Sequence, residues 1–320
     1  MFEVMLPKDD KGIREISNSE IQTFKQCRRK WWLKYSRGLR RRDELPISAM
    51  ATGTRIHSAL EHYYQSECDV NMLMTGLELA IEQDKNRIVE MLGGGFLLDA
   101  ALKTFVKAAN LERAMVQGYS EWIQETGADS TIEVIGTELK LSYPCVMNFG
   151  KIHLIGKIDI LVKDYRDGRV YIIDTKTCAS FEQFTKTAHI SEQPKFYQYL
   201  AQHTLPDEQH ASGAIFNLLK KVGRTARAKP PFYMRHTVHN NPQTISSLAS
   251  GLPNVLNDIR KEETRGVHYP SPTGSCVWTC PFFAICHKFD DGYHVEELLA
   301  EQYTVSDPNS YYGTTDDHTD

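Results

Sequence analysis

The sequence predicts a mixed α/β fold, because a long helical stretch is followed by short apolar strands that alternate with further helices. The helical stretch runs from about Asn71 to Gln124 and is interrupted at Gly93–Gly95. Strands rich in apolar and β-branched residues are expected between Thr131 and Thr177 and again at Ala214–Leu219 and Phe232–Val238. Helices are expected around Gln193 and over Gln243–Glu263. This order of elements is typical of a sheet flanked by helices.

The chain of 320 residues is long enough for one large domain or two small ones. We expect a first helix that begins at Ser17–Glu20, where a serine can cap it. The domain prediction comprises an irregular leader (1–16), an N-terminal helical region (17–130), a core (131–265), a cysteine segment (266–290) and a helix end with an acidic tail (291–320). The tail is rich in Ser, Thr, Asp and Gly after Tyr303, and we expect it to be disordered.

Two acids and a lysine stand out in a predicted hairpin whose turn is Asp164–Gly168. The first strand contains Gly156–Asp159, and the second ends with Asp174–Lys176. Side chains alternate along a strand, so Asp174 and Lys176 share one face while Thr175 points to the other. A partner strand that brings Asp159 to the same end would complete an oxygen-rich site suited to a hard divalent cation. The alternative is a surface ion pair at the end of a strand.

Two further motifs flank the hairpin in the sequence. Gln193 and Tyr197 are four residues apart, so a helix would present both on one face. The plainer interpretation is a core tyrosine beside a solvated glutamine. His57 lies in Gly53–Glu61, at the start of a long helical region. By its pattern alone, a single histidine there is more often packed or solvated than a metal ligand.

Together these motifs resemble the PD-(D/E)XK nuclease superfamily, and specifically its RecB-like branch, over roughly Ser17 to Lys288. The resemblance implies a restriction-endonuclease-like core with a central mixed sheet. It implies that His57, Asp159, Asp174 and the Thr175 carbonyl hold Mg²⁺ or Mn²⁺, with Asp159, Asp174 and Lys176 as catalytic residues. Gln193 and Tyr197 match the QxxxY helix that positions DNA. Asp174 stands where many members have glutamate, which keeps a carboxylate ligand. Glu138, on the preceding strand, matches a further acidic position of some members.

The seven cysteines are an odd number, and no signal peptide precedes them. Both observations favour a reducing, cytoplasmic environment over a disulfide framework. Three cysteines, Cys276, Cys280 and Cys286, lie close together, and Cys27 is the natural candidate for a fourth ligand. We expect the other three, Cys68, Cys145 and Cys178, to be free thiols.

One early cysteine and three late ones are similar to the iron-sulfur members of the same branch. The resemblance implies a [4Fe-4S] cluster held by Cys27, Cys276, Cys280 and Cys286, with a structural role. Three residues separate Cys276 from Cys280, where many members have two. Zinc is the alternative for four cysteines, although zinc sites more often contain paired CxxC motifs.

The net charge of −4, from 41 acidic and 37 basic residues, gives no global sign of nucleic-acid binding. Local charge does. Lys25–Arg42 contains nine basic residues and no acid, with Trp31, Trp32 and Tyr35 interleaved. This run, in particular Arg28, Arg29 and Lys30, is predicted to position DNA, with the tryptophans packing in the core. The alternative is a solvated basic face.

A second run free of acids reads as a basic loop. It contains Lys220, Lys221, Arg224, Arg227, Lys229 and Arg235. The chain has no GxxxxGK[ST] phosphate loop, which excludes a helicase motor of its own, and no apolar stretch long enough for a membrane span.

The resemblance implies a metal-dependent deoxyribonuclease, with exonuclease action on free DNA ends, in phage or prokaryotic recombination, repair or CRISPR-type DNA processing. DNA is the expected partner, with single strands or single-stranded ends favoured, alongside recombination or CRISPR-adaptation proteins. Two alternatives belong to other classes. One is a non-catalytic DNA-binding accessory that keeps the nuclease fold. The other is a structural zinc-binding protein whose charged strand ends are incidental.

Overall fold

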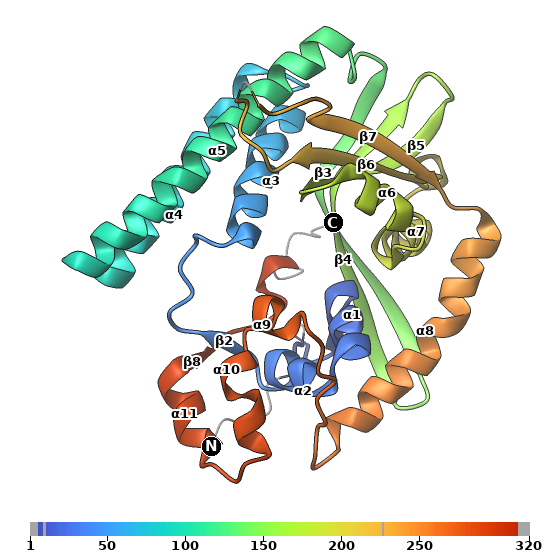
Figure 1. Cartoon of the computed structure of the whole chain (residues 1–320). Coiled ribbons are helices and arrows are strands. Elements are labelled where there is room, and N and C mark those ends of the chain that lie inside the picture. The colour runs from blue at the N-terminus through green and yellow to red at the C-terminus, as the bar shows by residue number, and fades with distance from the viewer. Residues whose placement is uncertain (1–5, 9–10, 226, 313–320) are drawn as a thin grey trace. The chain divides into compact units, whose positions relative to one another are not determined.

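A computed structural model describes residues 6–8, 11–225 and 227–312 (Figure 1). Contacts divide the chain into two compact units. Unit 1 lies within residues 1–44, 140–157 and 243–320, and unit 2 comprises residues 45–139 and 158–242 apart from residue 226. Each unit is therefore assembled from segments that are distant in the sequence. The domain boundaries predicted from the sequence stay predictions.

The central sheet of unit 2 is mixed, which confirms the predicted α/β class. Its strands follow the order β4, β5, β6, β7, and β3 pairs with β4. β5 runs antiparallel to β4 and parallel to β6, and β7 runs antiparallel to β6. The strands are β3 (Ile132–Met147), β4 (Gly150–Asp164), β5 (Arg169–Cys178), β6 (Gly213–Lys220) and β7 (Tyr233–His239). β3 and β4 also contribute residues 140–157 to unit 1.

Helices cover both faces of this sheet because alternate strand residues are apolar on both sides. One face, with Ile173 and Ile215, packs against α3 (Ala49–Gln65), α4 (Asn71–Leu92) and α5 (Phe96–Thr126). The opposite face, with Phe216 and Leu218, packs against α6 (Phe181–Ala188). α7 (Glu192–Thr204) contacts β6 and is followed by the short helix η2 (Asp207–Gln209).

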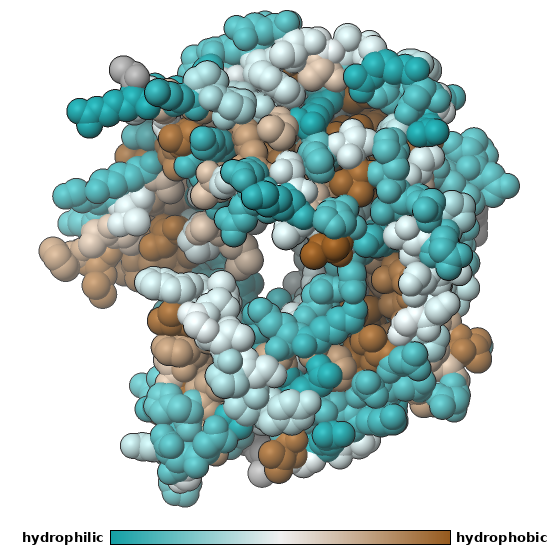
Figure 2. Space-filling view, turned by 45° about the vertical axis from the view of Figure 1, so that its right-hand side comes forward, coloured by the Kyte–Doolittle hydropathy of each residue, from teal (hydrophilic) through white to brown (hydrophobic). Residues whose placement is uncertain are grey.

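Helices α4 and α5 form a long hairpin (Figure 1). The predicted break at Gly93–Gly95 is confirmed, since Gly93 and Gly95 have positive φ angles of 69° and 85° that favour glycine. The residues at the hairpin end include Phe96, which is 84% exposed, and Leu97. Figure 2 shows this end as a hydrophobic patch at the left of a mostly hydrophilic face.

Unit 1 contains strand β1 (Arg14–Ser17), which runs parallel to β4 over Ile152–Ile155. Ser17 caps α1 as predicted, with its side chain accepting from the Glu20 amide. The remaining elements are α1 (Asn18–Gln26), α2 (Arg28–Trp31), η1 (Trp32–Ser36), β2 (Leu39–Arg41), α8 (Pro242–Glu263), α9 (Cys276–Thr279), α10 (Phe283–Cys286), η3 (His287–Phe289), α11 (Val295–Gln302), β8 (Tyr303–Val305) and η4 (Ser310–Tyr312).

Two expectations about the chain ends were wrong within the described residues. The predicted irregular leader contains β1, because Arg14–Ser17 finds a parallel partner in β4. The predicted disordered tail contains β8, which pairs antiparallel with β2. This pairing supplies hydrogen-bond partners to backbone groups along one edge of β2. Tyr312 is buried. Residues 313–320 of the predicted tail lie outside the described residues. Within the described part of the chain, no helix is both long and apolar enough to cross a membrane.

Candidate active site

The hairpin of β4 and β5 brings the two predicted catalytic acids to one end of the sheet. Ile160 pairs with Ile173, so Asp159 and Asp174 follow at the same end of the antiparallel ladder. Asp174 is almost fully buried, whereas the side chain of Asp159 is partly exposed. The predicted neighbourhood of the two acids therefore follows from strand register.

His57 comes to the same place from helix α3. Its Nδ1 lies 3.0 Å from Asp159 Oδ2, and its Nε2 lies 2.8 Å from the Thr175 carbonyl oxygen. Two residues before His57, the buried Arg55 bonds to Glu112 of α5 and to Asp84 of α4. These bonds tie the three helices together and fix the segment of α3 that presents His57.

Lys176 connects Asp174 to the predicted DNA-positioning residues. Its ammonium group lies 2.8 Å from Asp174 Oδ1 and donates to Gln193 Oε1 at 3.1 Å. The Gln193 amide in turn donates to the Tyr197 hydroxyl at 3.3 Å, across one turn of α7. The seven residues predicted for the hydrolytic site thus form two hydrogen-bonded groups in unit 2. One group is His57, Asp159 and Thr175. The other is Asp174, Lys176, Gln193 and Tyr197.

Burial and charge shift the pKa values of this site in opposite ways. Burial lowers the pKa of His57, but the hydrogen bond and charge of Asp159 outweigh it and leave the pKa raised. Burial raises the pKa of Asp174, which disfavours its ionised form. Burial also lowers the pKa of Lys176, yet the adjacent Asp174 carboxylate raises it overall. Lys176 is therefore an ammonium ion at neutral pH.

The donor set fits a hard divalent cation. It combines carboxylates, a backbone carbonyl and an imidazole. One carboxylate oxygen of Asp174, Oδ1, pairs with Lys176. The other, Oδ2, is buried and has no hydrogen-bond partner among the described residues, so it is available to a ligand. As they stand, no three His, Cys, Asp or Glu side chains in the described ranges gather closely enough to hold a metal ion. A cation that bound here would replace the hydrogen bonds of His57 to Asp159 and Thr175.

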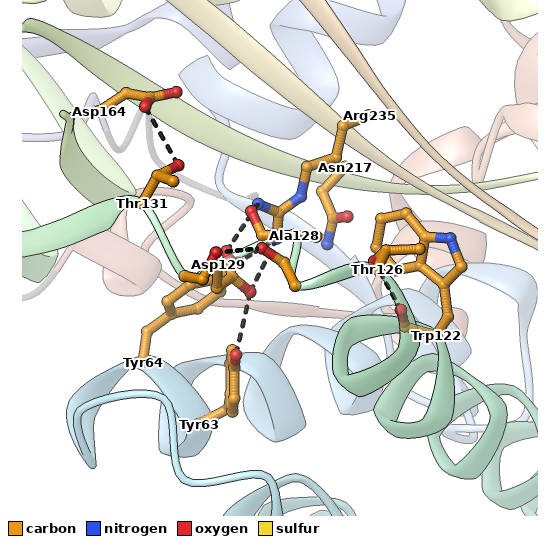
Figure 3. Close-up of polar contacts among 12 residues, drawn as sticks. Tyr63, Tyr64, Trp122, Thr126, Ala128, Asp129, Thr131, Asp164, Asn217 and Arg235 are labelled. Carbon is orange, nitrogen blue, oxygen red and sulfur yellow. Dashed lines mark hydrogen bonds and ion pairs between the residues drawn. The ribbon is translucent and has the colours of Figure 1, made fainter. Parts of the chain in front are cut away.

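A buried polar cluster lies behind the site and was missed in the sequence. Figure 3 shows Arg235 and the α3 tyrosines Tyr63 and Tyr64 turned toward Asp129. Arg235 donates to both Asp129 oxygens at 2.6 and 3.0 Å, and Tyr63 donates to Asp129 at 3.0 Å. Because Tyr63 and Tyr64 follow His57 on the same helix, this cluster anchors α3 to the sheet.

Asn217 of strand β6 contacts the predicted hydrolytic site. The Asn217 amide donates to Thr175 Oγ1 at 3.4 Å, as expected for a threonine that points away from Asp174 and Lys176. Asn217 is also the register partner of Arg235 in the ladder of β6 and β7. The interpretation of Arg235 as part of a basic loop was therefore wrong, since it is a largely buried residue of strand β7. The strand predicted at Phe232–Val238 already contained Arg235, so of the two interpretations of this residue the strand was the correct one.

The four predicted cluster cysteines lie in unit 1. Cys27 caps α2, and its sulfur accepts from the backbone amides of Lys30 and Ser271 at 3.5 and 3.4 Å. Cys276 accepts from the Thr273 amide at 3.3 Å, and these hydrogen bonds lower the pKa of its thiol. Arg29 donates to Cys286 at 3.9 Å. Burial outweighs the effect of Arg29 and raises the pKa of the Cys286 thiol, and burial also raises the pKa of the Cys280 thiol.

The three residues of α2 that were predicted to contact DNA differ in their burial and in their contacts within the protein. Arg29 is 5% exposed and forms a bidentate ion pair with Asp290, both bonds at 2.8 Å. We therefore do not propose Arg29 as a DNA contact. The Arg28 guanidinium lies over the Phe24 ring, and Lys30 bonds to Gln26 on the surface. Arg28 and Lys30 stay predictions, as does Glu138, which lies in β3 with a φ of 52°.

Comparisons with known proteins define the class of this chain. The sequence profile of the PD-(D/E)XK nuclease superfamily matches residues 15–287. The chain belongs to this superfamily. A solved structure described as the crystal structure of SSO0001 is similar over 63% of this chain and 79% of its own, with 16% identity and a TM-score of 0.31. The search of curated proteins found no match.

Proposed function

We propose that this protein is a metal-dependent deoxyribonuclease that acts on DNA with free ends. Membership of the superfamily makes it a candidate phosphodiesterase with a nucleic-acid substrate. The observation that carries the proposal is the buried Asp174 carboxylate, which offers an unpartnered oxygen next to an ammonium group. A protein that only binds DNA gains nothing from burying a carboxylate where phosphates must approach.

His57, Asp159, Asp174 and the Thr175 carbonyl would hold Mg²⁺ or Mn²⁺. When bound, the ion supplies Lewis-acid polarisation of the phosphate and a water of lowered pKa. The residues of the chain have other tasks. Lys176, as an ammonium ion between Asp174 and Gln193, orients the attacking water and offsets negative charge that develops on the phosphate. Gln193 and Tyr197 position the DNA strand.

We further propose that Cys27, Cys276, Cys280 and Cys286 bind an iron-sulfur cluster, of the [4Fe-4S] type, with a structural role. The hydrogen-bond donors around Cys27, Cys276 and Cys286 support this proposal. By resemblance, the biological setting would be phage or prokaryotic recombination, repair or CRISPR-type processing in a cytoplasm, with recombination or CRISPR-adaptation proteins as partners.

The test is digestion of end-labelled linear and closed circular DNA, single- and double-stranded, with Mg²⁺ or Mn²⁺ and with EDTA. The protein should be purified without oxygen and its iron and zinc measured. Metal-dependent loss of linear DNA with intact circles would support an exonuclease. Cleavage of circles would establish an endonuclease instead. No cleavage by protein that retains iron would overturn the proposal and favour the DNA-binding accessory.

A further inference from the structure

The cysteine segment of unit 1 carries a tryptophan that the fold does not use. Trp31 is buried and donates to Glu20, Trp32 stacks on His268, and Trp122 stacks on Tyr119. The fourth tryptophan of the chain, Trp278, is 85% exposed. Its ring contacts no other aromatic ring or cation among the described residues. Tryptophan is enriched at binding surfaces, where its ring supplies a large apolar face.

The surroundings of Trp278 are aromatic and lack acids. Residues 266–289 contain no aspartate or glutamate over 24 positions, in a chain with 41 acids. Tyr269 and Phe283 in this segment are about half exposed. The surface therefore offers faces for stacking without a nearby carboxylate in its own segment that would repel phosphate.

A second acid-free segment lies against the first. The Arg29 amide donates to the Tyr269 carbonyl at 3.1 Å, and the Ser271 amide donates to Cys27 at 3.4 Å. These bonds join the basic run Lys25–Arg42 to the cysteine segment. The backbone amides of Lys30 and Ser271 both donate to the Cys27 sulfur, so Lys30 lies against the cysteine segment. A basic residue thus lies against the segment that carries the exposed indole.

We propose that Trp278 stacks on a base of single-stranded DNA, while Lys30, which lies against the same cysteine segment, neutralises the backbone. The inference rests on the proposed DNA substrate and adds a specific binding residue to it. Only a base without its own stacking neighbour can receive an indole, so this surface selects single strands over intact duplex. Positive charge on one side and an aromatic face on the other are what a single-stranded polyanion requires.

The experiment compares the full-length protein with Trp278→Ala, Trp278→Phe and Val277→Ala, all in a Lys176→Ala background with EDTA so that no DNA is cut. Binding of a labelled oligothymidylate is measured by fluorescence anisotropy. We expect Trp278→Ala to weaken binding about 5- to 100-fold, with Trp278→Phe in between. Val277→Ala, at the adjacent exposed position, should bind like the parent protein. Iron content of every variant checks that the cysteine segment is intact.

An abasic oligonucleotide supplies the decisive comparison. If Trp278 stacks on a base, removing the bases should weaken binding by the parent protein and have much less effect on Trp278→Ala. Equal binding by parent and Trp278→Ala, with intact iron, would overturn the inference even if the wild type cleaves DNA. If Trp278→Ala changes the oligomeric state of the protein in solution but not its DNA affinity, the inference is overturned in favour of a contact between copies of the chain. Because no hydrolysis is involved, failure here is distinguishable from failure of the proposed nuclease activity.

Discussion

The ammonium group of Lys176 has two polar partners, which makes it a sharp probe of the proposed chemistry. It bonds to Asp174 and to Gln193, so it links the predicted metal site to the predicted DNA-positioning helix. Because Asp174 raises the pKa of Lys176, we predict that Lys176 offsets charge in the proposed reaction and does not accept a proton. This assignment distinguishes charge stabilisation from proton abstraction.

We expect Lys176→Ala to reduce the rate of DNA cleavage about 10²- to 10³-fold, the usual effect of removing one stabilising group. DNA binding in EDTA should change little. The matched control is Lys186→Ala, which removes an exposed lysine of the same unit whose ion-pair partner within the described residues is Glu182. Initial rates on end-labelled DNA measure the effect. A rate for Lys176→Ala equal to that of the control would exclude the assigned role.

The buried carboxylate of Asp174 predicts a metal-dependent stabilisation of the protein. A bound cation would compensate the oxygen that has no partner, so Mg²⁺ or Mn²⁺ should raise the melting temperature. At 100 times the Kd the gain is about 2.7 kcal/mol, or roughly 5–10 °C for a unit of this size. Asp174→Asn should remove this shift, since it removes a charged ligand.

The control for Asp174→Asn is Asp164→Asn. Asp164 is the last residue of β4 and bonds to Arg166 and Thr131. Its loss should lower the starting melting temperature but leave the metal-dependent increase intact. Differential scanning fluorimetry with metal titration measures both. A metal shift that survives in Asp174→Asn would place the cation elsewhere.

At the scale of elements, the buried pair of Arg235 and Asp129 holds strand β7 to the segment before β3 and, through Tyr63, to helix α3. Removing one member of a buried ion pair leaves an unpaired charge in the interior and typically costs about 3–5 kcal/mol. The cluster therefore sets the position of α3, on which His57 depends. Its contribution is to stability and alignment, not to DNA contact.

We expect Arg235→Ala to destabilise unit 2 by about 3–5 kcal/mol in urea unfolding. Lys229→Ala, from the same basic run but at an exposed position, should change stability by less than about 0.5 kcal/mol. When both variants are folded, Lys229→Ala should bind DNA more weakly than Arg235→Ala does. Similar stabilities for both variants would contradict the structural role of Arg235.

The elements that sequence analysis predicted well are those set by local pattern. The β4–β5 hairpin and the helix with Gln193 and Tyr197 follow from alternation and from four-residue spacing. Asp129 and Arg235 could not be paired in this way, because 106 residues separate them and their contact depends on the register of β6 and β7. Strand β8 was missed for a similar reason, since its partner β2 lies near the other end of the chain.

At the scale of the whole molecule, the two ends of the chain meet within unit 1. Strand β2 pairs with β8, Arg29 pairs with Asp290, and Arg37 forms a bidentate pair with Glu296. Leu33 and Leu39 share a core cluster with Phe282 and Leu299. An iron-sulfur cluster held by Cys27, Cys276, Cys280 and Cys286 would add metal–ligand cross-links between two chain segments that already pack together. Its loss should therefore loosen unit 1 without unfolding it.

We expect Cys27→Ser to lose the bound iron and to speed amide hydrogen exchange in α2, α9 and α10, while the strands of unit 2 keep their protection. Cys145→Ser is the matched control, because Cys145 also lies in unit 1 but is predicted to be a free thiol. That variant should keep both iron and slow exchange. Iron retained at the wild-type level in Cys27→Ser would exclude Cys27 as a ligand, and faster exchange throughout unit 2 would show that the cluster supports more than the joined chain ends.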